Sequence, residues 1–268
     1  MAYVGAGFSR TVRATARWTL EGDHDDSPYI TSSELAALVK PRAAVSWSGG
    51  KDSYLALHRS LSQFDIVAAV TMFNDDGTRS RSHGLRPEVI AAQTQRLGLR
   101  HVRGCASWST YEDAYRAALR ELRALEITHV IFGDIMYESN RAFPERVCAA
   151  EGLTAVEPLW GESTATLYRE FIATGATAHI VTVRGDRLSP DWLGRPLTIE
   201  MLPAFDALGV DACGEHGEYH TVVVDAPLFS TPLDVTIGTT VAHDGCWAVD
   251  LLLNASERAG DSAGAASL

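Results

Sequence analysis

The sequence predicts an α/β protein built on a doubly wound parallel sheet, with a smaller α+β region at its C-terminal end. From residue 43 to about residue 183, short apolar runs alternate with stretches of helical period, as in parallel strands joined by helices. The run DIVAAVTMF (65–73) is almost continuously apolar, which is typical of a strand covered on both faces. After residue 185, strand-like runs are joined by turns instead.

Periodicity and helix punctuation define the elements of the first part. The helix at 87–99 begins with a proline and ends near Gly98. The helix at 109–126 is amphipathic and begins with a capping serine or threonine. A further helix contains RVCAAEGL and ends at Gly152. In chain order, we expect elements at 43–47, 52–61, 65–73, 87–99, 109–126, 128–135, 146–152 and 178–185.

The C-terminal part is predicted to consist of strands joined by turns. Residues 218–229, 233–245 and 246–253 form three strand-like runs, and His243-Asp244-Gly245 is predicted to be the hairpin turn between the last two. The sequence therefore divides into an N-terminal extension (1–40), a nucleotide-binding domain (41–160), a C-terminal region (161–254), and a tail (255–268) that has no apolar face and is expected to be disordered.

Composition argues against several classes of protein. The net charge of -11 means that the surface as a whole repels a nucleic-acid backbone, so tRNA or DNA is not expected as the main partner. No apolar run approaches the ~18 residues that span a membrane. The four cysteines lie far apart and form no CxxC pair, which supports neither a zinc ribbon nor a thioredoxin-like site and indicates reduced thiols in a cytoplasmic protein.

The segment VSWSGGKDS (45–53) joins the first predicted strand to the first helix. It is not a Walker A loop, because Lys51 is followed by Asp52 and the chain's other lysine, Lys40, by Pro41. Glycines here expose backbone N–H groups, and the start of the following helix adds positive potential. The loop is therefore predicted to bind phosphate at the sheet edge where doubly wound folds bind ligands.

Asp52 is unexpected in such a loop, because a carboxylate repels an anionic ligand. Two explanations remain open from the sequence. The carboxylate could carry Mg²⁺, whose charge reverses the local electrostatics, or it could cap the N-terminus of the helix. A glycine turn with a capping aspartate and no ligand is the simpler structural interpretation of the same six residues, SGGKDS.

At these residues the chain resembles the PP-loop ATP pyrophosphatases, and within them the diphthine–ammonia ligase family. The resemblance extends over about residues 41–253 and implies a Rossmann-like domain of the PP-loop type followed by an acceptor-binding region at 161–254. Its most specific motif is CGEHGEYHTVVVDAPLF (213–229). The other motifs are VSWSGGKDSYLALH (45–58), RSHGLRPEVIAAQTQRLGL (81–99), GDI (133–135), RVCAAEGL (146–153) and EPLW (157–160).

The resemblance implies ATP as the bound nucleotide and Mg²⁺ as its accompanying ion, held by Asp52. The nucleotide would be bound by Ser48, Gly49, Gly50, Lys51, Asp52, Ser53, Gly133 and Asp134. The acceptor would be faced by Glu215, Gly217, Glu218, His220 and Thr221. Among these residues, Lys51, Asp52, Glu218 and His220 are expected to take part in catalysis.

Two further features remain open. Arg141 and Glu145 lie four residues apart on a predicted helix and could contact phosphate or acceptor, although an ordinary helix ion pair also explains the spacing. On a strand, His216, Glu218 and His220 would share one face, which suggests a metal site. However, HGEYH is not HExxH and no cysteine pair accompanies it. His216 also departs from the smaller or amide residue usual in the family, which bears on the identity of the acceptor.

The sequence therefore predicts an ATP-dependent ligase. The carboxylate of a small-molecule or protein-borne acceptor would be adenylated with loss of pyrophosphate, and ammonia or another amine would then form the amide. One alternative is an enzyme of the same fold that modifies tRNA, which the acidic surface and the missing CxxC pair disfavour. The other is a nucleotide-binding sensor without turnover, which would need no second site at 213–229. A homo-oligomer is compatible with all of these functions.

Overall fold

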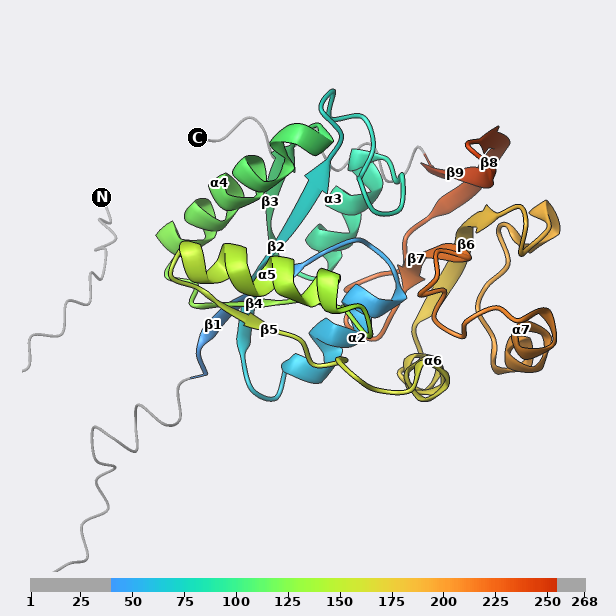
Figure 1. Ribbon diagram of the computed structural model, residues 1–268, viewed down its shortest axis with the longest axis horizontal. Helices are drawn as coiled ribbons and strands as arrows, with labels where there is room; N and C mark the ends of the chain where they lie inside the picture. Colours follow the sequence, from blue (N-terminus) through green and yellow to red (C-terminus); the bar gives the residue numbers. More distant parts are fainter. Residues whose placement is uncertain (1–39, 255–268) are drawn as a thin grey trace, which may run out of the picture. The chain divides into compact units, whose positions relative to one another are not determined.

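The computed structural model describes residues 40–254 (Figure 1). The extension before residue 41, apart from Lys40, and the tail at 255–268 lie outside these residues. Within the described part of the chain, no helix is long and apolar enough to cross a membrane.

The first sheet is parallel and has the strand order β3-β2-β1-β4-β5. Its strands are β1 (Arg42–Ser46), β2 (Asp65–Phe73), β3 (Arg100–Cys105), β4 (His129–Ile131) and β5 (Thr154–Val156). The chain builds outward from β1 to β3 and then returns to the other side of β1 with β4. This reversal of order places a topological switch point between β1 and β4, where ligands bind in doubly wound folds.

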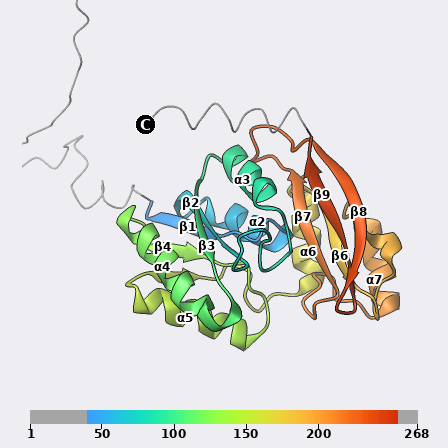
Figure 2. The same cartoon turned by 90° about the horizontal axis from the view of Figure 1, so that it is seen from above.

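Helices cover both faces of this sheet, which confirms the predicted fold class. The helices are α2 (Lys51–Ser60), α3 (Pro87–Arg96), α4 (Tyr111–Ala124) and α5 (Glu138–Ala150), with a short 3₁₀ turn at Trp108–Thr110 before α4. Side chains of β1 alternate between two cores: Ala43 and Val45 pack with α2 and α3, whereas Ala44 packs with α4 and α5. Figure 2 shows α4 and α5 together on one side of the sheet.

The second sheet is antiparallel and has the order β7-β6-β9-β8. Two helices, α6 (Thr164–Ala173) and α7 (Leu202–Leu208), belong to this part, along with 3₁₀ turns at Pro190–Trp192 and Ile199–Met201. Its strands are β6 (Thr177–Arg184), β7 (Tyr219–Asp225), β8 (Val235–His243) and β9 (Cys246–Leu253). The sequence predicts one α/β alternation up to about residue 183, but the structure ends it at β5, because β6 pairs antiparallel with β7 and β9.

The predicted turn between the last two strands is confirmed. Asp244 and Gly245 have φ values of 49° and 78°, and His243 pairs with Cys246 across them. Positive φ at both central residues is the requirement of the tight hairpin turns that match the twist of their strands.

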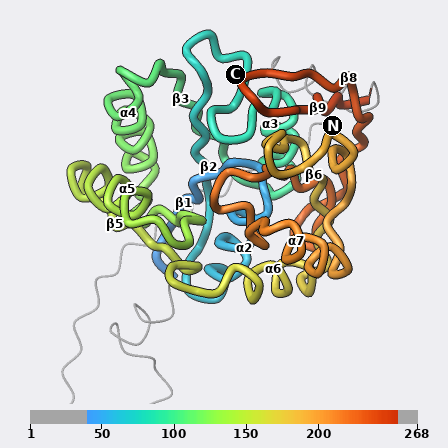
Figure 3. The backbone as a smooth tube through the Cα atoms, turned by 45° about the vertical axis from the view of Figure 1, so that its right-hand side comes forward, coloured from blue at the N-terminus to red at the C-terminus, as the bar shows by residue number. Residues whose placement is uncertain are grey.

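The two sheets share one core. Helix α2 contacts β7 and helix α3 contacts β9, so the second sheet lies beside the α2–α3 face of the first. In Figure 3 the C-terminal hairpin of β8 and β9 lies next to α3, although the two are more than a hundred residues apart in sequence. This packing brings β7 to the carboxyl edge of the parallel sheet, where the SGGKDS loop lies.

Candidate active site

The SGGKDS loop leaves β1 at the switch point and is held rigidly from the side of α3. Trp47 is buried, and its indole N–H donates to Oε1 of Gln93 at 3.0 Å. The amide nitrogen of Gln93, which is also fully buried, donates to the carbonyl oxygen of Gly49 at 2.9 Å. Gly49 has φ +85°, so the loop turns sharply at a residue without a side chain.

Strand β7 of the second sheet holds the other side of the loop. The backbone N–H of Val223 donates to the carbonyl of Gly49 at 2.8 Å, and the N–H of Lys51 donates to the hydroxyl of Thr221 at 3.1 Å. Thr221 is almost completely buried, so this hydroxyl fixes the first turn of α2. The shape of the phosphate-type loop therefore depends on a strand that lies 170 residues further along the chain.

Three loop residues form a closed set of hydrogen bonds among themselves. The backbone N–H of Gly50 donates to Oγ of Ser48 at 3.3 Å, and Ser48 donates to Oγ of Ser53 at 3.1 Å. Ser53 in turn donates to the carbonyl of Gly50 at 3.0 Å. In this structure the predicted nucleotide ligands Ser48, Gly50 and Ser53 thus shape the loop.

Lys51 is a buried cation. Its Nζ donates to Oδ2 of Asp52 at 2.9 Å and to the carbonyl of Cys213, and it lies 5.2 Å from the centre of the Tyr219 ring. Burial acts to lower the pKa of Lys51, but the charge of Asp52 and other nearby groups outweighs burial and raises this pKa above its ordinary value. Lys51 therefore stays protonated at neutral pH.

A cavity of about 200 Å³ opens beside these residues. It brings together eight of the residues predicted from the sequence: Lys51, Asp52, Gly133, Asp134, Glu215, Gly217, His220 and Thr221. His83 lines the cavity too. Four further residues that line the cavity were not predicted from the sequence: Asn140, Cys213, Gly214 and Tyr219. The available signal was that Cys213, Gly214 and Tyr219 belong to the CGEHGEYHT motif itself and that Asn140 shortly follows GDI.

The GDI motif reaches the loop because glycine permits a close approach. A Cβ atom at Gly133 would lie 2.9 Å from the carbonyl carbon of Asp52 and 3.0 Å from the nitrogen of Ser53. Only a residue without a side chain lets the end of β4 pack against the start of α2 at this distance. Asp134 is thereby placed on the same cavity as Asp52.

The cavity carries an excess of carboxylate. Burial, with the charge of Asp52 as the second cause, raises the pKa of Asp134 to about 6 and that of Glu215 to about 7. Lys51 is the single cation among the lining residues. Within residues 40–254 no three His, Cys, Asp or Glu side chains are arranged to hold a metal ion by themselves. One or two carboxylates together with a ligand's phosphates are, however, the usual surroundings of Mg²⁺ in proteins, and Asp52 and Asp134 fit that pattern.

Glu218 does not line the cavity, whereas the sequence predicts it among the acceptor-facing and catalytic residues. Its side chain is buried, and its carboxylate accepts hydrogen bonds from the backbone N–H groups of Asp211 at 3.1 Å and His216 at 2.9 Å. Strand β7 begins only at Tyr219, so His216, Glu218 and His220 do not share a strand face. Glu218 instead holds the turn that carries the CGEHGEYHT motif.

Arg141 and Glu145 do not line the cavity either. Nε of Arg141 lies 2.9 Å from Oε1 of Glu145, which is the ordinary helix ion pair that the sequence left as the second explanation. The guanidinium of Arg141 also lies 5.2 Å from the Trp160 ring and 3.7 Å from Oε2 of Glu157. These contacts occupy Arg141 on the surface of α5.

Comparison with known protein families gives two consecutive matches. A model described as the diphthamide synthase N-terminal domain matches residues 41–155, and one described as the diphthamide synthase C-terminal domain matches residues 163–255. The first contains the parallel sheet with the SGGKDS and GDI motifs, and the second contains the antiparallel sheet with the CGEHGEYHT motif.

Individual relatives agree with these matches. The chain is 30% identical over 229 residues to a rat protein named diphthine–ammonia ligase, which covers 75% of this chain and 85% of the rat protein. A mouse protein of the same name is 29% identical over 230 residues, with the same shares covered. Among solved structures, a predicted subunit of a tRNA methyltransferase from Methanocaldococcus jannaschii matches 70% of this chain and 98% of its own, at 16% identity and a TM-score of 0.37.

Proposed function

We propose that this chain, which belongs to the diphthamide synthase family, is an ATP-dependent ligase that converts a carboxylate to an amide. The chain matches the family over both of its domains, and it matches most of the length of a diphthine–ammonia ligase. The acceptor is the carboxylate of diphthine or of a closely similar protein-borne or free acid, and the amine is ammonia. We place this reaction in the cytoplasm, in line with four free cysteines.

The reaction has two steps. An oxygen of the acceptor carboxylate attacks the α-phosphorus of ATP, and the bond from that phosphorus to the α–β bridging oxygen breaks, so that pyrophosphate leaves. The nitrogen of ammonia then attacks the carbonyl carbon of the acyl-adenylate, AMP leaves, and the nitrogen loses a proton as the amide forms. Both steps depend on orientation of the reactants and on stabilisation of the charge that develops on phosphate oxygens.

One observation carries the proposal: a buried cation, two carboxylates and a helix N-terminus meet at the switch point of the parallel sheet. Lys51 supplies positive charge for the phosphates, and the N-terminus of α2 adds positive potential, although the backbone N–H of Lys51 itself is bound by Thr221. Asp52 and Asp134 would hold Mg²⁺, which neutralises phosphate charge when it is bound. Asp52 therefore fits a phosphate site as a metal ligand and as the partner of Lys51.

Residues of the second sheet are assigned the acceptor side of the reaction. Glu215 and His220 line the same cavity as Lys51 and come from the CGEHGEYHT motif. Burial lowers the pKa of His220 to about 3, so its ring is neutral at physiological pH and does not compete with Lys51 for the phosphates. Glu215 is a carboxylate that suits the incoming ammonium ion.

Product analysis by phosphorus NMR tests this function. The full chain is incubated with Mg-ATP, ammonium and a protein that carries diphthine, and the Asp52→Ala variant serves as the control. We expect AMP and pyrophosphate in amounts equal to the amide formed, and neither above background with Asp52→Ala. Formation of ADP and phosphate would contradict the α–β cleavage. Binding of ATP without any turnover in the complete mixture would instead support a sensor.

The raised carboxyl pKa values predict opposite effects of pH on the free and the loaded protein. A carboxyl whose folded pKa lies above its unfolded value stabilises the fold at low pH, and that contribution is lost as pH rises through the folded pKa. For Asp134 (about 6) and Glu215 (about 7), the melting temperature of the free protein should therefore contain a contribution that falls between about pH 4 and pH 7. Binding of Mg-ATP needs the ionised form of Asp134 and should weaken as pH falls below about 6, approaching tenfold per pH unit.

Thermal-shift measurements between pH 5 and pH 8, with and without Mg-ATP, check this prediction. Because ATP itself titrates in this range, the comparison is made with Asp134→Asn, which removes one titrating group from the cavity. The wild-type stabilisation by Mg-ATP should depend more steeply on pH than that of Asp134→Asn. Equal slopes in the two proteins would show that Asp134 does not govern binding.

A further inference from the structure

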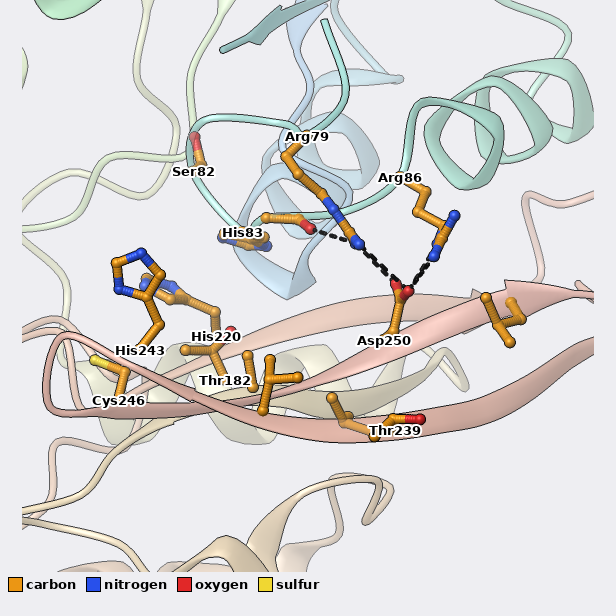
Figure 4. Close-up of a pocket in the computed structure, with 15 residues that line it drawn as sticks. Arg79, Ser82, His83, Arg86, Thr182, His220, Thr239, His243, Cys246 and Asp250 are labelled. Carbon is orange, nitrogen blue, oxygen red and sulfur yellow. Dashed lines mark hydrogen bonds and ion pairs between the residues drawn. The ribbon is translucent and has the colours of Figure 1, made fainter. Parts of the chain in front are cut away.

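A second and larger cavity, of about 570 Å³, lies between the segment 79–86 and the antiparallel sheet. Its roof is the segment 79–86 between β2 and α3, and its floor is one face of the β8–β9 hairpin (Figure 4). Most of the floor residues alternate along their strands, as expected for side chains on one face: Thr239, Val241 and His243 on β8, and Cys246, Ala248, Asp250 and Leu252 on β9. Val249 of β9 and Thr182 of β6 also line the cavity.

The two cavities share His83 and His220. The rings of these residues stack with their centres 4.8 Å apart and an angle of 26° between their planes. Nδ1 of His83 lies 2.8 Å from the carbonyl oxygen of Thr221, so Nδ1 carries the proton and donates. Within residues 40–254 the ring of His220 makes no hydrogen bond. A polar ring between two cavities is therefore available to a ligand.

The larger cavity differs from the smaller one in its charge. Asp250 on its floor pairs with Arg79 at 2.8 Å and with Nε of Arg86 at 2.7 Å, so these three side chains together carry one positive charge (Figure 4). The buried rings of His83 and His220 are uncharged, because burial lowers their pKa values to about 4 and about 3. The remaining floor is largely apolar or hydroxylated, so this cavity lacks the excess of carboxylate found around Lys51. Its volume lies within the range of ordinary ligand pockets, whereas the smaller cavity is below that range.

We propose that the larger cavity binds the stem of the acceptor, an extended and mainly apolar chain, and that the acceptor carboxylate passes the His83–His220 pair to reach the nucleotide. The smaller cavity cannot hold the phosphates and the whole acceptor together, and the larger one adjoins it at the rings of these two histidines. His220 contacts the carboxylate on its way to the α-phosphorus. This assignment rests on the proposed ligase function and adds to it the place and the direction of acceptor entry.

Tryptophan on the floor of the larger cavity tests the assignment. Thr239→Trp and Val241→Trp place a large side chain in the cavity from an exposed strand, and Thr240→Trp places the same side chain on the opposite face of that strand. In the product assay with the diphthine-bearing protein, we expect the first two variants to raise the acceptor KM by about tenfold or more. The affinity for Mg-ATP should stay within about twofold of wild type in all three, and Thr240→Trp should match wild type in both quantities.

Other results would overturn the assignment without touching the ligase function. If Thr239→Trp and Val241→Trp bind and use the acceptor as wild type does, the acceptor does not occupy this cavity. If they weaken Mg-ATP binding as much as they raise the acceptor KM, the cavity belongs to the nucleotide. Failure of the ligase function itself would give a different result, because wild type would then form no acceptor-dependent AMP. A melting curve for each variant confirms that the compared proteins are folded.

Discussion

Replacement of Lys51 by methionine will lower the rate of AMP formation by about 10³-fold, corresponding to about 4 kcal/mol of transition-state stabilisation. Lys51 is 3% exposed, and its Nζ is held by Asp52 and by the carbonyl of Cys213 at the wall of the nucleotide cavity. Methionine has a similar length and fits the same space, but it carries no charge. The substitution removes the cation for the phosphates and leaves the negative charge of Asp52 without its partner.

The chain supplies a matched control for this experiment. Lys40 is the only other lysine, and it is exposed, with Nζ donating to the carbonyl of Leu61 at 2.7 Å. Lys40→Met should keep wild-type kinetics. Both variants are assayed for AMP formation and for melting temperature, so that a loss of activity is separated from a loss of fold. If Lys51→Met retained roughly a tenth or more of the wild-type turnover rate, the role given to this cation would be contradicted.

Replacement of Gly50 by alanine will destabilise the protein by about 2–3 kcal/mol and weaken ATP binding. The backbone at Gly50 has φ −97°, which alanine accepts, so the cost comes from contacts alone. A Cβ atom there would lie 2.2 Å from Cε1 of His83 and 3.1 Å from the carbonyl oxygen of Thr221. The His83 ring cannot simply swing aside, because it is hydrogen bonded to Thr221 and stacked on His220.

A double-mutant cycle isolates this clash. In the Gly50→Ala/His83→Ala variant the ring is absent, so the combined cost should be smaller than the sum of the single costs by about 1–3 kcal/mol. Gly84→Ala is the comparison for a glycine in open space: its φ of +65° should cost roughly 1 kcal/mol through backbone strain alone. Urea denaturation of the four variants gives the free energies of unfolding. Strict additivity of Gly50→Ala and His83→Ala would show that the ring is not what excludes a side chain.

The strongly patterned elements of the fold were predictable from the sequence. The strands at 65–73 and 246–253 were predicted with the bounds that the structure has, because each is largely apolar and is bounded by turn residues. Strands β3 and β5 were not predicted. In RHVRGC only Val102 and Gly104 are buried, since β3 is the edge of its sheet, and β5 has only three residues. An exposed edge and a short strand leave no apolar period to detect.

The sequence pattern also did not predict the two short helices of the C-terminal part. Nor did it predict which strands pair with β6. The run 178–185 has the composition of a buried strand, and a buried strand has the same composition in a parallel or an antiparallel sheet. Only the pairing of β6 with β7 and β9 decides which sheet it joins. The sequence therefore predicted the strand and misplaced it in the alternation.

For the site, the sequence by itself determined the local chemistry: a glycine turn before a helix, with Lys51 and Asp52 in its first turn, and a second glycine-aspartate pair at the end of β4. Only the tertiary structure decided which way the side chains of the CGEHGEYHT residues point and what they contact. Glu218 turns inward because the N–H groups of Asp211 and His216 converge on it, Thr221 is used to hold the SGGKDS loop, and His220 lies between two cavities. The direction of a polar side chain depends on donors and acceptors from distant segments, and these are positioned only when the second sheet packs against the first.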